Sequence, residues 1–222
     1  MRTEQTSSSP PDFIVIEGPI GVGKTSLTHR LAECFGRQTL LERAEDNPFL
    51  EEFYRDGDAA AFPAQLHFLF QRSRQLETLH QRELFSDGLV ADFMFAKDRL
   101  FAQLNLGKDE LALYEEVYSR LSMDAPVPDL VVYLQAPVEV LLRRIRRRAR
   151  PQERTLSADY LARVNEAYTR FFYRYEDAPV LIVNAASINP IDNDSDFNAL
   201  VEHIRRPQTS RCYFNPPPLA IN

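Results

Sequence analysis

Long apolar runs are missing from this sequence, and no stretch approaches the roughly 18 residues that a helix needs to cross a bilayer. Residues 1–11 are polar and rich in serine, so they also lack the apolar core of a signal peptide. The sequence therefore predicts a protein that is neither inserted in a membrane nor exported.

Cysteine is scarce as well, since Cys34 and Cys212 are the only two in the chain. Two cysteines make no disulfide framework, which favours a reducing compartment and hence a cytoplasmic protein. Cys34 falls on the apolar face of a predicted helix, so we expect it to be a buried free thiol.

An excess of positive charge is also absent, because 32 acidic residues outweigh 26 lysines and arginines and give a net charge of −6. A protein that binds a nucleic-acid polymer needs a basic surface to neutralise phosphates, so such a partner is not expected. The 222 residues, 44% of them hydrophobic and 26% charged, suit a single globular domain with one sizeable core.

The most informative stretch is residues 12–25. Its apolar run Phe13–Ile16 predicts a short buried strand. The following segment Gly18–Thr25, GPIGVGKT, fits the phosphate-binding loop pattern in full, and its glycines let backbone N–H groups turn toward a phosphate. A helical pattern then runs to Gly36, with its N-terminus directed at the same phosphates. Strand, loop and helix follow in the required order, which favours a nucleoside triphosphate site over a chance match.

Each part of this loop has an expected role. Lys24 reaches the β and γ phosphates as a point charge and counts among the catalytic residues, while the Thr25 hydroxyl ligates Mg²⁺. The residues expected to contact ATP are Gly18, Pro19, Ile20, Gly21, Val22, Gly23, Lys24, Thr25 and Ser26.

Further short apolar runs predict the remaining strands, and helical patterns lie between them. The predicted strands after the first are residues 39–42, 89–91, 128–134 and 180–183. The predicted helices after the first are about 47–57, 62–85, 109–121, 138–148, 157–175 and 197–204. This alternation predicts an α/β fold of the P-loop kinase type, with a five-stranded parallel sheet flanked by helices. We expect one domain over residues 12–205, a disordered tail over 1–11 and an irregular proline-rich tail over 206–222.

Acidic residues follow two of the predicted strands, at the edge of the sheet where sites of open α/β folds lie. Glu42, after the second strand, could be the general base that takes a proton from an attacking hydroxyl. Asp92, after the third strand, could hold Mg²⁺ directly or through water beside the acceptor. The alternative is that both are solvated acids at strand ends.

A run of arginines follows the fourth strand and predicts a lid. Arg144 and Arg148 are one helical turn apart and share a face. Pro151 pushes Arg150 out of the helical region, so Arg150 can turn back toward the same phosphates. Arginines that close over a transferring phosphoryl group stabilise its charge and exclude water. The alternative is a solvated basic face or a nucleic-acid patch.

These motifs together resemble the deoxyribonucleoside kinases, the family that includes deoxycytidine, deoxyguanosine and deoxyadenosine kinases. The resemblance extends from about Phe13 to Val183. It rests on Gly18–Thr25, Glu42 followed by Asp46–Tyr54, Phe62-x-x-Gln65 with Arg72, Lys97–Ala102 with Asn105-Leu106, Pro128–Ala136, and Arg144, Arg148 and Arg150 followed by Glu153.

The resemblance implies roles for the matching positions. Glu42 matches the base that deprotonates the 5′-hydroxyl, and Tyr54 and Glu153 match the pair that holds the sugar 3′-hydroxyl. Gln65 matches the side chain that contacts the nucleobase edge, and a matching charged pair, Arg72 with Asp98, lies beyond it; Arg144, Arg148 and Arg150 match the lid arginines. Gln65 and Arg72 are spaced to project from one side of a helix, although the same spacing also suits a polar seam on a surface helix.

One position departs from the family. The acid that ends strand three is usually followed directly by an arginine that steadies the base and the 5′-hydroxyl, whereas Phe93 follows Asp92 here. A rival register makes Asp98-Arg99 the acid–arginine pair, but the apolar run 89–91 ends at Asp92. Lys97 or Arg99 could supply the missing positive charge, and the sequence leaves that choice open.

The sequence thus predicts an ATP- and Mg²⁺-dependent kinase of nucleotide salvage that phosphorylates the 5′-hydroxyl of a deoxyribonucleoside, with purines favoured. A nucleoside monophosphate kinase of the thymidylate type is the alternative enzyme, but it needs a second basic clamp and the region 42–55 is acidic. A non-catalytic nucleotide-binding subunit is the other alternative. The family resemblance implies a homodimer formed through helices beside the sheet.

Overall fold

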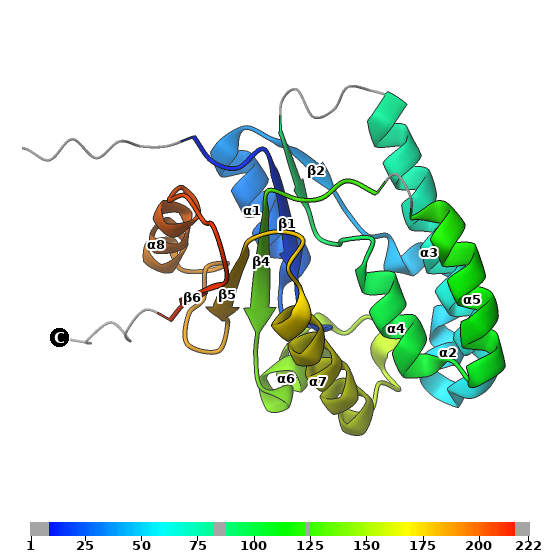
Figure 1. The fold of residues 1–222 in the computed structure, drawn as a ribbon. Coiled ribbons are helices and arrows are strands. Elements are labelled where there is room, and N and C mark those ends of the chain that lie inside the picture. Colours follow the sequence, from blue (N-terminus) through cyan, green and yellow to red (C-terminus); the bar gives the residue numbers. More distant parts are fainter. Residues whose placement is uncertain (1–8, 82–87, 123–124, 216–222) are drawn as a thin grey trace, which may run out of the picture.

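The computed structural model describes residues 9–81, 88–122 and 125–215. Within these ranges a parallel sheet of six strands, in the order β2-β3-β1-β4-β5-β6, forms the central layer (Figure 1). The strands are β1 (Phe13–Glu17), β2 (Gln38–Leu40), β3 (Leu89–Ala91), β4 (Leu130–Gln135), β5 (Val180–Asn184) and β6 (Cys212–Phe214).

Strand β1 lies in the middle of the sheet, between β3 and β4. Its Val15 aligns with Ala91 on one side and with Val131 on the other. All five residues of β1 are buried, as expected for a strand covered on both faces. The chain leaves β1 at a point where the strand order reverses, and ligands of open α/β sheets bind in the crevice at such a point.

Helices connect the strands and cover the two faces of the sheet. The α-helices are α1 (Lys24–Phe35), α2 (Leu50–Asp56), α3 (Asp58–Gln81), α4 (Lys97–Asn105), α5 (Lys108–Leu121), α6 (Val138–Arg148), α7 (Ala158–Arg174) and α8 (Asp194–Ile204), and two short 3-10 helices are η1 (Ala44–Asp46) and η2 (Pro151–Glu153). None of the helices in the described residues is both long and apolar enough to cross a membrane.

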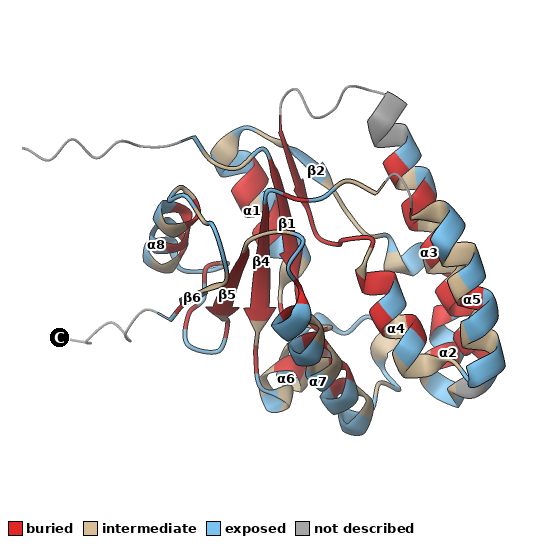
Figure 2. Ribbon diagram, viewed as in Figure 1, coloured by how far each residue is buried: buried red, intermediate tan, exposed pale blue. Residues whose placement is uncertain are grey.

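The helices form one layer on each face of the sheet, and each layer packs against its own apolar core. Helices α1 and α8 pack on one face of the sheet, where Leu27 and Leu200 meet Ile14 and Ile16. Helices α3, α4, α5 and α7 cover the other face in a second core, and α3 and α5 lie side by side at the flank (Figure 1). The four inner strands, β1, β3, β4 and β5, are almost entirely buried, whereas the edge strands β2 and β6 are partly exposed (Figure 2). The layering confirms the predicted α/β fold.

The prediction of five strands was wrong by one. Strand β6 lies in the region 206–222, which was expected to be irregular; it pairs with β5 at the edge of the sheet. This strand is only three residues long. Its outer residues, Cys212 and Phe214, pack against the core, and the middle residue, Tyr213, is 70% exposed. A three-residue alternation is too short to be told from a loop by periodicity. Residues 216–222 of the expected tail lie outside the described residues, as do 1–8 of the N-terminal tail.

Helix α4 was not predicted, and three predicted helices, α2, α3 and α8, start three or four residues away from the predicted position. Helix α3 begins at Asp58 rather than at residue 62, because three strong helix formers, Ala59–Ala61, extend it and two of them are buried. Its predicted end, residues 82–85, lies outside the described residues. Helix α2 begins at Leu50 instead of 47, since the Asn47 side chain accepts a hydrogen bond from the backbone of Phe49 and forms a turn there.

The expectation that Cys34 is buried was wrong, because its thiol is exposed. Helix α1 buries Leu27, Leu31 and Ala32, and in its last turn Phe35 packs against the core instead of Cys34. The turn that carries Cys34 therefore faces away from the sheet.

Candidate active site

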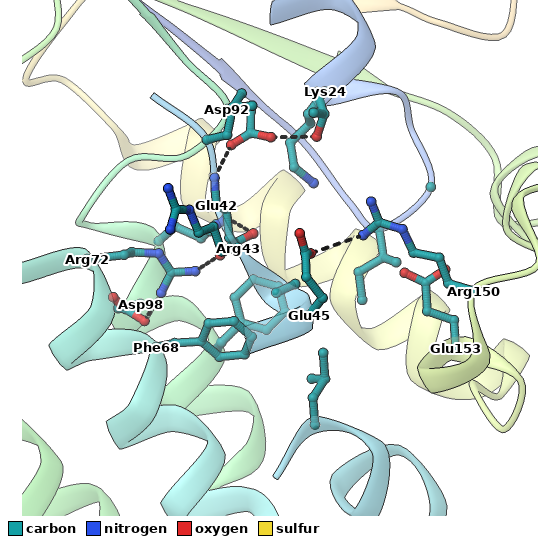
Figure 3. A pocket seen from close by; sticks show the side chains of 18 of the residues that line it. Lys24, Glu42, Arg43, Glu45, Phe68, Arg72, Asp92, Asp98, Arg150 and Glu153 are labelled. Carbon is teal, nitrogen blue, oxygen red and sulfur yellow. Dashed lines mark hydrogen bonds and ion pairs between the residues drawn. The ribbon is translucent and has the colours of Figure 1, made fainter. Parts of the chain in front are cut away.

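A cavity of about 470 Å³ opens at the carboxyl ends of the central strands, beside the phosphate-binding loop (Figure 3). This volume suits a small-molecule ligand. The loop, the segment after β2, helices α2, α3, α4 and α7, and the η2 segment all contribute to its walls. Most of the predicted site residues line it, namely Ile20, Gly21, Lys24, Thr25, Glu42, Tyr54, Gln65, Arg72, Asp92, Asp98, Arg148, Arg150 and Glu153.

The phosphate-binding loop has the backbone that its glycines require. Gly21 has φ +83°, and a Cβ there would lie 2.6 Å from Ile145 Cγ1 and 3.1 Å from the Leu141 carbonyl, both in α6. Lys24 donates a hydrogen bond of 2.8 Å to the Gly18 carbonyl, and burial lowers the pKa of its ammonium group, as does the charge of Lys97. The N-terminus of α1 therefore faces the cavity together with the half-buried ammonium of Lys24.

Asp92 joins this loop to the segment after β2. One carboxylate oxygen accepts a hydrogen bond of 2.5 Å from the Thr25 hydroxyl, and the other accepts one of 2.6 Å from the Glu42 backbone N–H. These contacts bring together three residues that are far apart in the sequence, and Figure 3 shows Asp92 and Glu42 side by side.

The residues present fit a magnesium ion brought by a nucleotide. Thr25 and Asp92 converge as two hard oxygen donors beside the loop, and Mg²⁺ usually binds one or two protein oxygens together with substrate phosphates. A larger cluster of three or more histidine, cysteine or acidic side chains suited to a metal does not occur in the described part of the chain.

The Glu42 carboxylate is held between two cations. Arg72 binds Oε1, and the Lys97 ammonium lies 3.1 Å from Oε2. Burial alone would raise the pKa of Glu42, but the charges of Lys97, Arg72 and Lys24 outweigh it and lower the pKa to about 2. Glu42 is therefore ionised over the physiological pH range and can act as a proton acceptor.

Arg72 is itself fixed at the end of the cavity. It forms a buried ion pair with Asp98, and its guanidinium lies 5.1 Å from the ring centroid of Phe68 and 5.6 Å from that of Phe93. Burial lowers the pKa of Arg72, but the carboxylates of Asp98 and Glu42 raise it by more than burial lowers it. The net shift of the pKa is therefore upward. This charged pair forms the polar end wall of the cavity.

Gln65 lies on the same helix as Arg72 and lines the same cavity, which confirms that the two project to one side. The side chain is buried, and its Oε1 has no hydrogen-bond partner among the described residues. A buried amide oxygen without a partner costs free energy, so this atom is an available acceptor for a ligand.

Tyr54 and Glu153 face the cavity from α2 and η2. Burial raises the pKa of Tyr54, so its phenol keeps its proton and can donate a hydrogen bond. Glu153 accepts hydrogen bonds of 3.1 and 2.5 Å from Arg148. The two side chains thus offer one donor and one carboxylate acceptor.

The three arginines that were predicted to form a lid do not all line the cavity. Arg148 and Arg150 line the cavity, and Arg150 approaches Glu45 at 3.9 Å across it (Figure 3). Arg150 has the extended backbone expected before Pro151. Arg144 does not line this cavity; its guanidinium donates to the carbonyls of Val22 and Ala185, at 2.9 and 2.8 Å, and so supports the phosphate-binding loop.

The structure decides between the two candidates for the missing positive charge. Lys97 is buried and contacts Glu42, whereas Arg99 points outward and pairs with Glu115 at 2.7 Å. Phe93 packs under Arg72 instead of carrying the charge.

Sequence reasoning missed Glu17, the last residue of β1. Its fully buried carboxylate accepts hydrogen bonds of 2.9 Å from the Met94 backbone and 3.0 Å from the Tyr168 hydroxyl. It also lies 3.8 Å from the Lys97 ammonium. An acid at the end of a buried apolar run, directly before a phosphate-binding loop, was the signal that could have identified it.

The fold and this cavity define the class of protein. A phosphate-binding loop on a parallel sheet, with an ionised carboxylate and a cavity for a small molecule beside it, is the arrangement of an α/β kinase.

Comparison with known proteins identifies the family. The family model described as deoxynucleoside kinase matches residues 14–207. A deoxyguanosine kinase of Bacillus subtilis is 34% identical over 198 residues, which cover 87% of this chain and 96% of that protein. A deoxyadenosine/deoxycytidine kinase of the same organism is 28% identical, with 86% and 91% covered. The chain belongs to the deoxynucleoside kinase family and is an enzyme of nucleoside phosphorylation.

Solved structures share the fold. The deoxyadenosine kinase of M. mycoides with bound dATP superposes with a TM-score of 0.76 at 23% sequence identity, covering 87% of this chain and 99% of that one. The same enzyme with the products dCMP and dCDP gives 0.75.

Proposed function

We propose that this chain transfers the γ-phosphoryl group of ATP to the 5′-hydroxyl of a purine deoxyribonucleoside, as a nucleotide salvage enzyme. One observation carries the proposal: the Glu42 carboxylate lines the cavity between the phosphate-binding loop and a buried polar wall. A nucleoside that contacts that wall with its base presents its 5′-hydroxyl to Glu42, with the phosphates of ATP beyond it.

On the ATP side, the loop amides and the N-terminus of α1 hold the phosphates, and Lys24 neutralises charge that develops on the β and γ phosphates. Thr25 and Asp92 would hold Mg²⁺, which neutralises phosphate charge when it is bound with ATP. Calcium or EDTA in place of magnesium should abolish turnover in a coupled ADP assay if this assignment is correct.

On the acceptor side, Glu42 takes the proton of the 5′-hydroxyl as the oxygen attacks the γ-phosphorus. The new bond joins O5′ to the γ-phosphorus, the bond from that phosphorus to the β–γ bridging oxygen breaks, and ADP leaves. Tyr54 and Glu153 hold the 3′-hydroxyl by donating and accepting a hydrogen bond. Arg148 and Arg150 exchange their present acidic partners for phosphate oxygens, while Arg144 keeps the loop in place.

The polar wall narrows the choice of base, and the similarity to purine deoxynucleoside kinases favours purines among the bases that fit it. Gln65 Oε1 and Asp98 Oδ2 are buried acceptors without a partner among the described residues, and Arg72 Nε is a buried donor in the same condition. A base that carries both donors and acceptors along one edge satisfies them, as guanine, adenine and cytosine do. Among these three bases, the similarity to deoxyguanosine and deoxyadenosine kinases favours the two purines.

We also infer a homodimer formed through α3 and α5. Phe70 and Leu113 on these neighbouring helices are large apolar side chains with exposed fractions of 43% and 52%, and a second copy of the chain would bury them. Light scattering should read twice the chain mass of 25.6 kDa, and a reading of one chain would exclude the dimer.

A cytoplasmic location is our further inference, since Cys34 and Cys212 are unpaired, and cell fractionation tests it.

The direct test is ADP release from ATP and Mg²⁺ with a panel of deoxynucleosides and their 5′-monophosphates. We expect turnover with deoxynucleosides, fastest with deoxyguanosine or deoxyadenosine, and a 5′-monophosphate as the product. Turnover restricted to monophosphates would instead identify a nucleoside monophosphate kinase. If the protein binds ATP but turns over none of these substrates, it is a non-catalytic nucleotide-binding protein.

A further inference from the structure

The segment that carries the candidate base, residues 41–43, lies just beyond the sheet. Strand β2 ends at Leu40, whose carbonyl accepts a hydrogen bond of 3.1 Å from the Asp92 N–H. A strand of only three residues at the edge of a sheet offers few contacts to hold the chain that follows it. The position of the Glu42 carboxylate therefore depends on contacts made outside the sheet.

Two glutamines of α3 supply such contacts. Gln75 donates a hydrogen bond of 2.8 Å from Nε2 to the Leu41 carbonyl, and Gln71 donates one of 3.0 Å to the Arg43 carbonyl. The two glutamines are one helical turn apart, so their side chains leave the helix on the same side. Their amides thus hold the main chain immediately before and immediately after Glu42.

The same helix also holds the side chain of the candidate base. Arg72, which lies between the two glutamines in the sequence, binds Glu42 Oε1 (Figure 3). From the other side, Asp92 accepts the Glu42 backbone N–H at 2.6 Å. Helix α3 is itself anchored in the core by the buried side chains of Leu69 and Leu76, so it provides a rigid support.

The two glutamines leave their own amide oxygens unpaired. Oε1 of Gln71 and Oε1 of Gln75 are buried and have no hydrogen-bond partner among the described residues. An apolar side chain at either position would avoid a buried acceptor without a partner, so the stability of α3 alone does not favour glutamine there. What each amide contributes is its N–H donor to the main chain beside Glu42.

The two contacts are not equivalent. The Arg43 carbonyl accepts a second hydrogen bond, 3.1 Å from the Asp46 N–H in η1, and its contact with Gln71 lies at the surface. In the part of the chain that the structure describes, the Leu41 carbonyl accepts a hydrogen bond only from Gln75, which also lines the cavity. Removal of the Gln75 amide should therefore disturb the candidate base more than removal of the Gln71 amide.

We propose that Gln75, supported by Gln71, is a positioning residue that holds the main chain so that the Glu42 carboxylate is directed at the acceptor hydroxyl. This inference rests on the proposed kinase function. Gln75 acts on the reaction only through the position of Glu42. Such support matters because a misplacement of about 1 Å can lower a rate on the order of 100-fold.

The experiment measures kcat and the KM values for ATP and nucleoside in Gln75→Met, which keeps the length of the side chain and removes its N–H donor. We expect kcat to fall on the order of 10- to 100-fold, with both KM values within about threefold of wild type, because the binding groups stay in place. Gln71→Met should lower kcat less. Gln103→Met is the matched control, since it makes the same substitution at an exposed position of α4 and should keep wild-type kinetics.

A double-mutant cycle tests whether the effect passes through Glu42. In Glu42→Gln the proton acceptor is already lost, so the addition of Gln75→Met should change kcat by no more than about twofold. A general structural effect of Gln75→Met would instead lower kcat by the same factor in the wild-type and Glu42→Gln backgrounds.

Several results would overturn the inference. In an enzyme that turns over nucleosides, they are an unchanged kcat in Gln75→Met, a loss confined to KM, a larger loss in Gln71→Met, or an equal loss in both backgrounds of the cycle. Should Gln75→Met fail to fold, Gln75→Glu, which keeps the shape and loses the donor, is judged by the same criteria. A wild-type enzyme inactive on every nucleoside refutes the proposed function, and the role of Gln75 with it.

Discussion

At the scale of single residues, the site depends on charges that are buried together. Glu42, Arg72, Asp98, Lys97 and Glu17 all lie within one connected set of ion pairs. A buried charge that loses its partner is strongly destabilising, whereas a complete set is tolerated. This connectivity fixes the base at the mouth of the phosphate-binding loop before any substrate is present.

The sequence predicted the members of this set better than their contacts. The family resemblance placed Gln65, Arg72 and Glu42 in one site, and the spacing of Gln65 and Arg72 and the position of Glu42 after a strand agreed with it. The contact between Arg72 and Glu42 spans 30 positions, and no local pattern encodes such a pairing. Glu17 was overlooked because the predicted strand ended at Ile16, so the acid between that strand and the phosphate-binding loop was not considered.

A residue-scale prediction concerns Gln65. The variant Gln65→Leu removes the buried amide and leaves a polar edge of the base unpaired, at a cost of about 1–3 kcal/mol. We expect the KM for the nucleoside to rise on the order of 10- to 100-fold, while the KM for ATP, bound at the other end of the cavity, stays at the wild-type value. Steady-state kinetics in both substrates measure this. An equal rise in both KM values would contradict the assignment of Gln65 to the base.

At the scale of elements, the phosphate-binding loop and α6 are packed against each other. Arg144 of α6 holds the carbonyl of Val22, and Ile145 and Leu141 of α6 leave no room beside Gly21. The lid and the loop therefore share one surface, so a change in either should disturb the other.

The variant Gly21→Ala tests this packing. The positive φ costs about 1–2 kcal/mol for an alanine, and the new Cβ also collides with α6. We expect lower thermal stability and a KM for ATP raised on the order of tenfold or more.

The matched control is Gly36→Ala at the other end of α1. It has a similar φ of +64° but no atom within 4 Å of an added Cβ, so it should lose stability without a change in the KM for ATP. Equal KM values for ATP in the two variants would show that contact with α6 is unimportant.

The predicted helices and strands also show which elements the sequence could not predict. The first strand, the glycine loop and α1 were fully predicted, because each carries a strong local signal in the required order. Strand β6 was missed because three residues at a sheet edge gain their structure from pairing with β5. Helix α3 was predicted four residues too short at its start, because Pro63 was assumed to lie in the first turn, whereas it lies inside the helix.

At the scale of the whole molecule, a parallel sheet gathers residues that are distant along the chain. Lys24, Glu42, Gln65, Lys97 and Glu153 come from five different segments and line one cavity. Because the carboxyl ends of parallel strands meet at one edge, the fold class predicted this convergence for Lys24 and Glu42, whereas the family resemblance was needed for Gln65 and Glu153. The depth of the cavity and the burial of its polar end wall emerge only from the packing of α3, α4 and α7.

The most direct test of the central claim is the kcat of Glu42→Gln with deoxyguanosine and ATP, measured beside the ATP affinity of the same variant. A glutamine keeps the shape but cannot take the proton, so we expect kcat to fall on the order of 10²- to 10⁴-fold while the Kd for ATP stays unchanged. A Glu42→Gln enzyme that phosphorylates deoxyguanosine at the wild-type rate would contradict the account, because the acceptor would then be activated without Glu42.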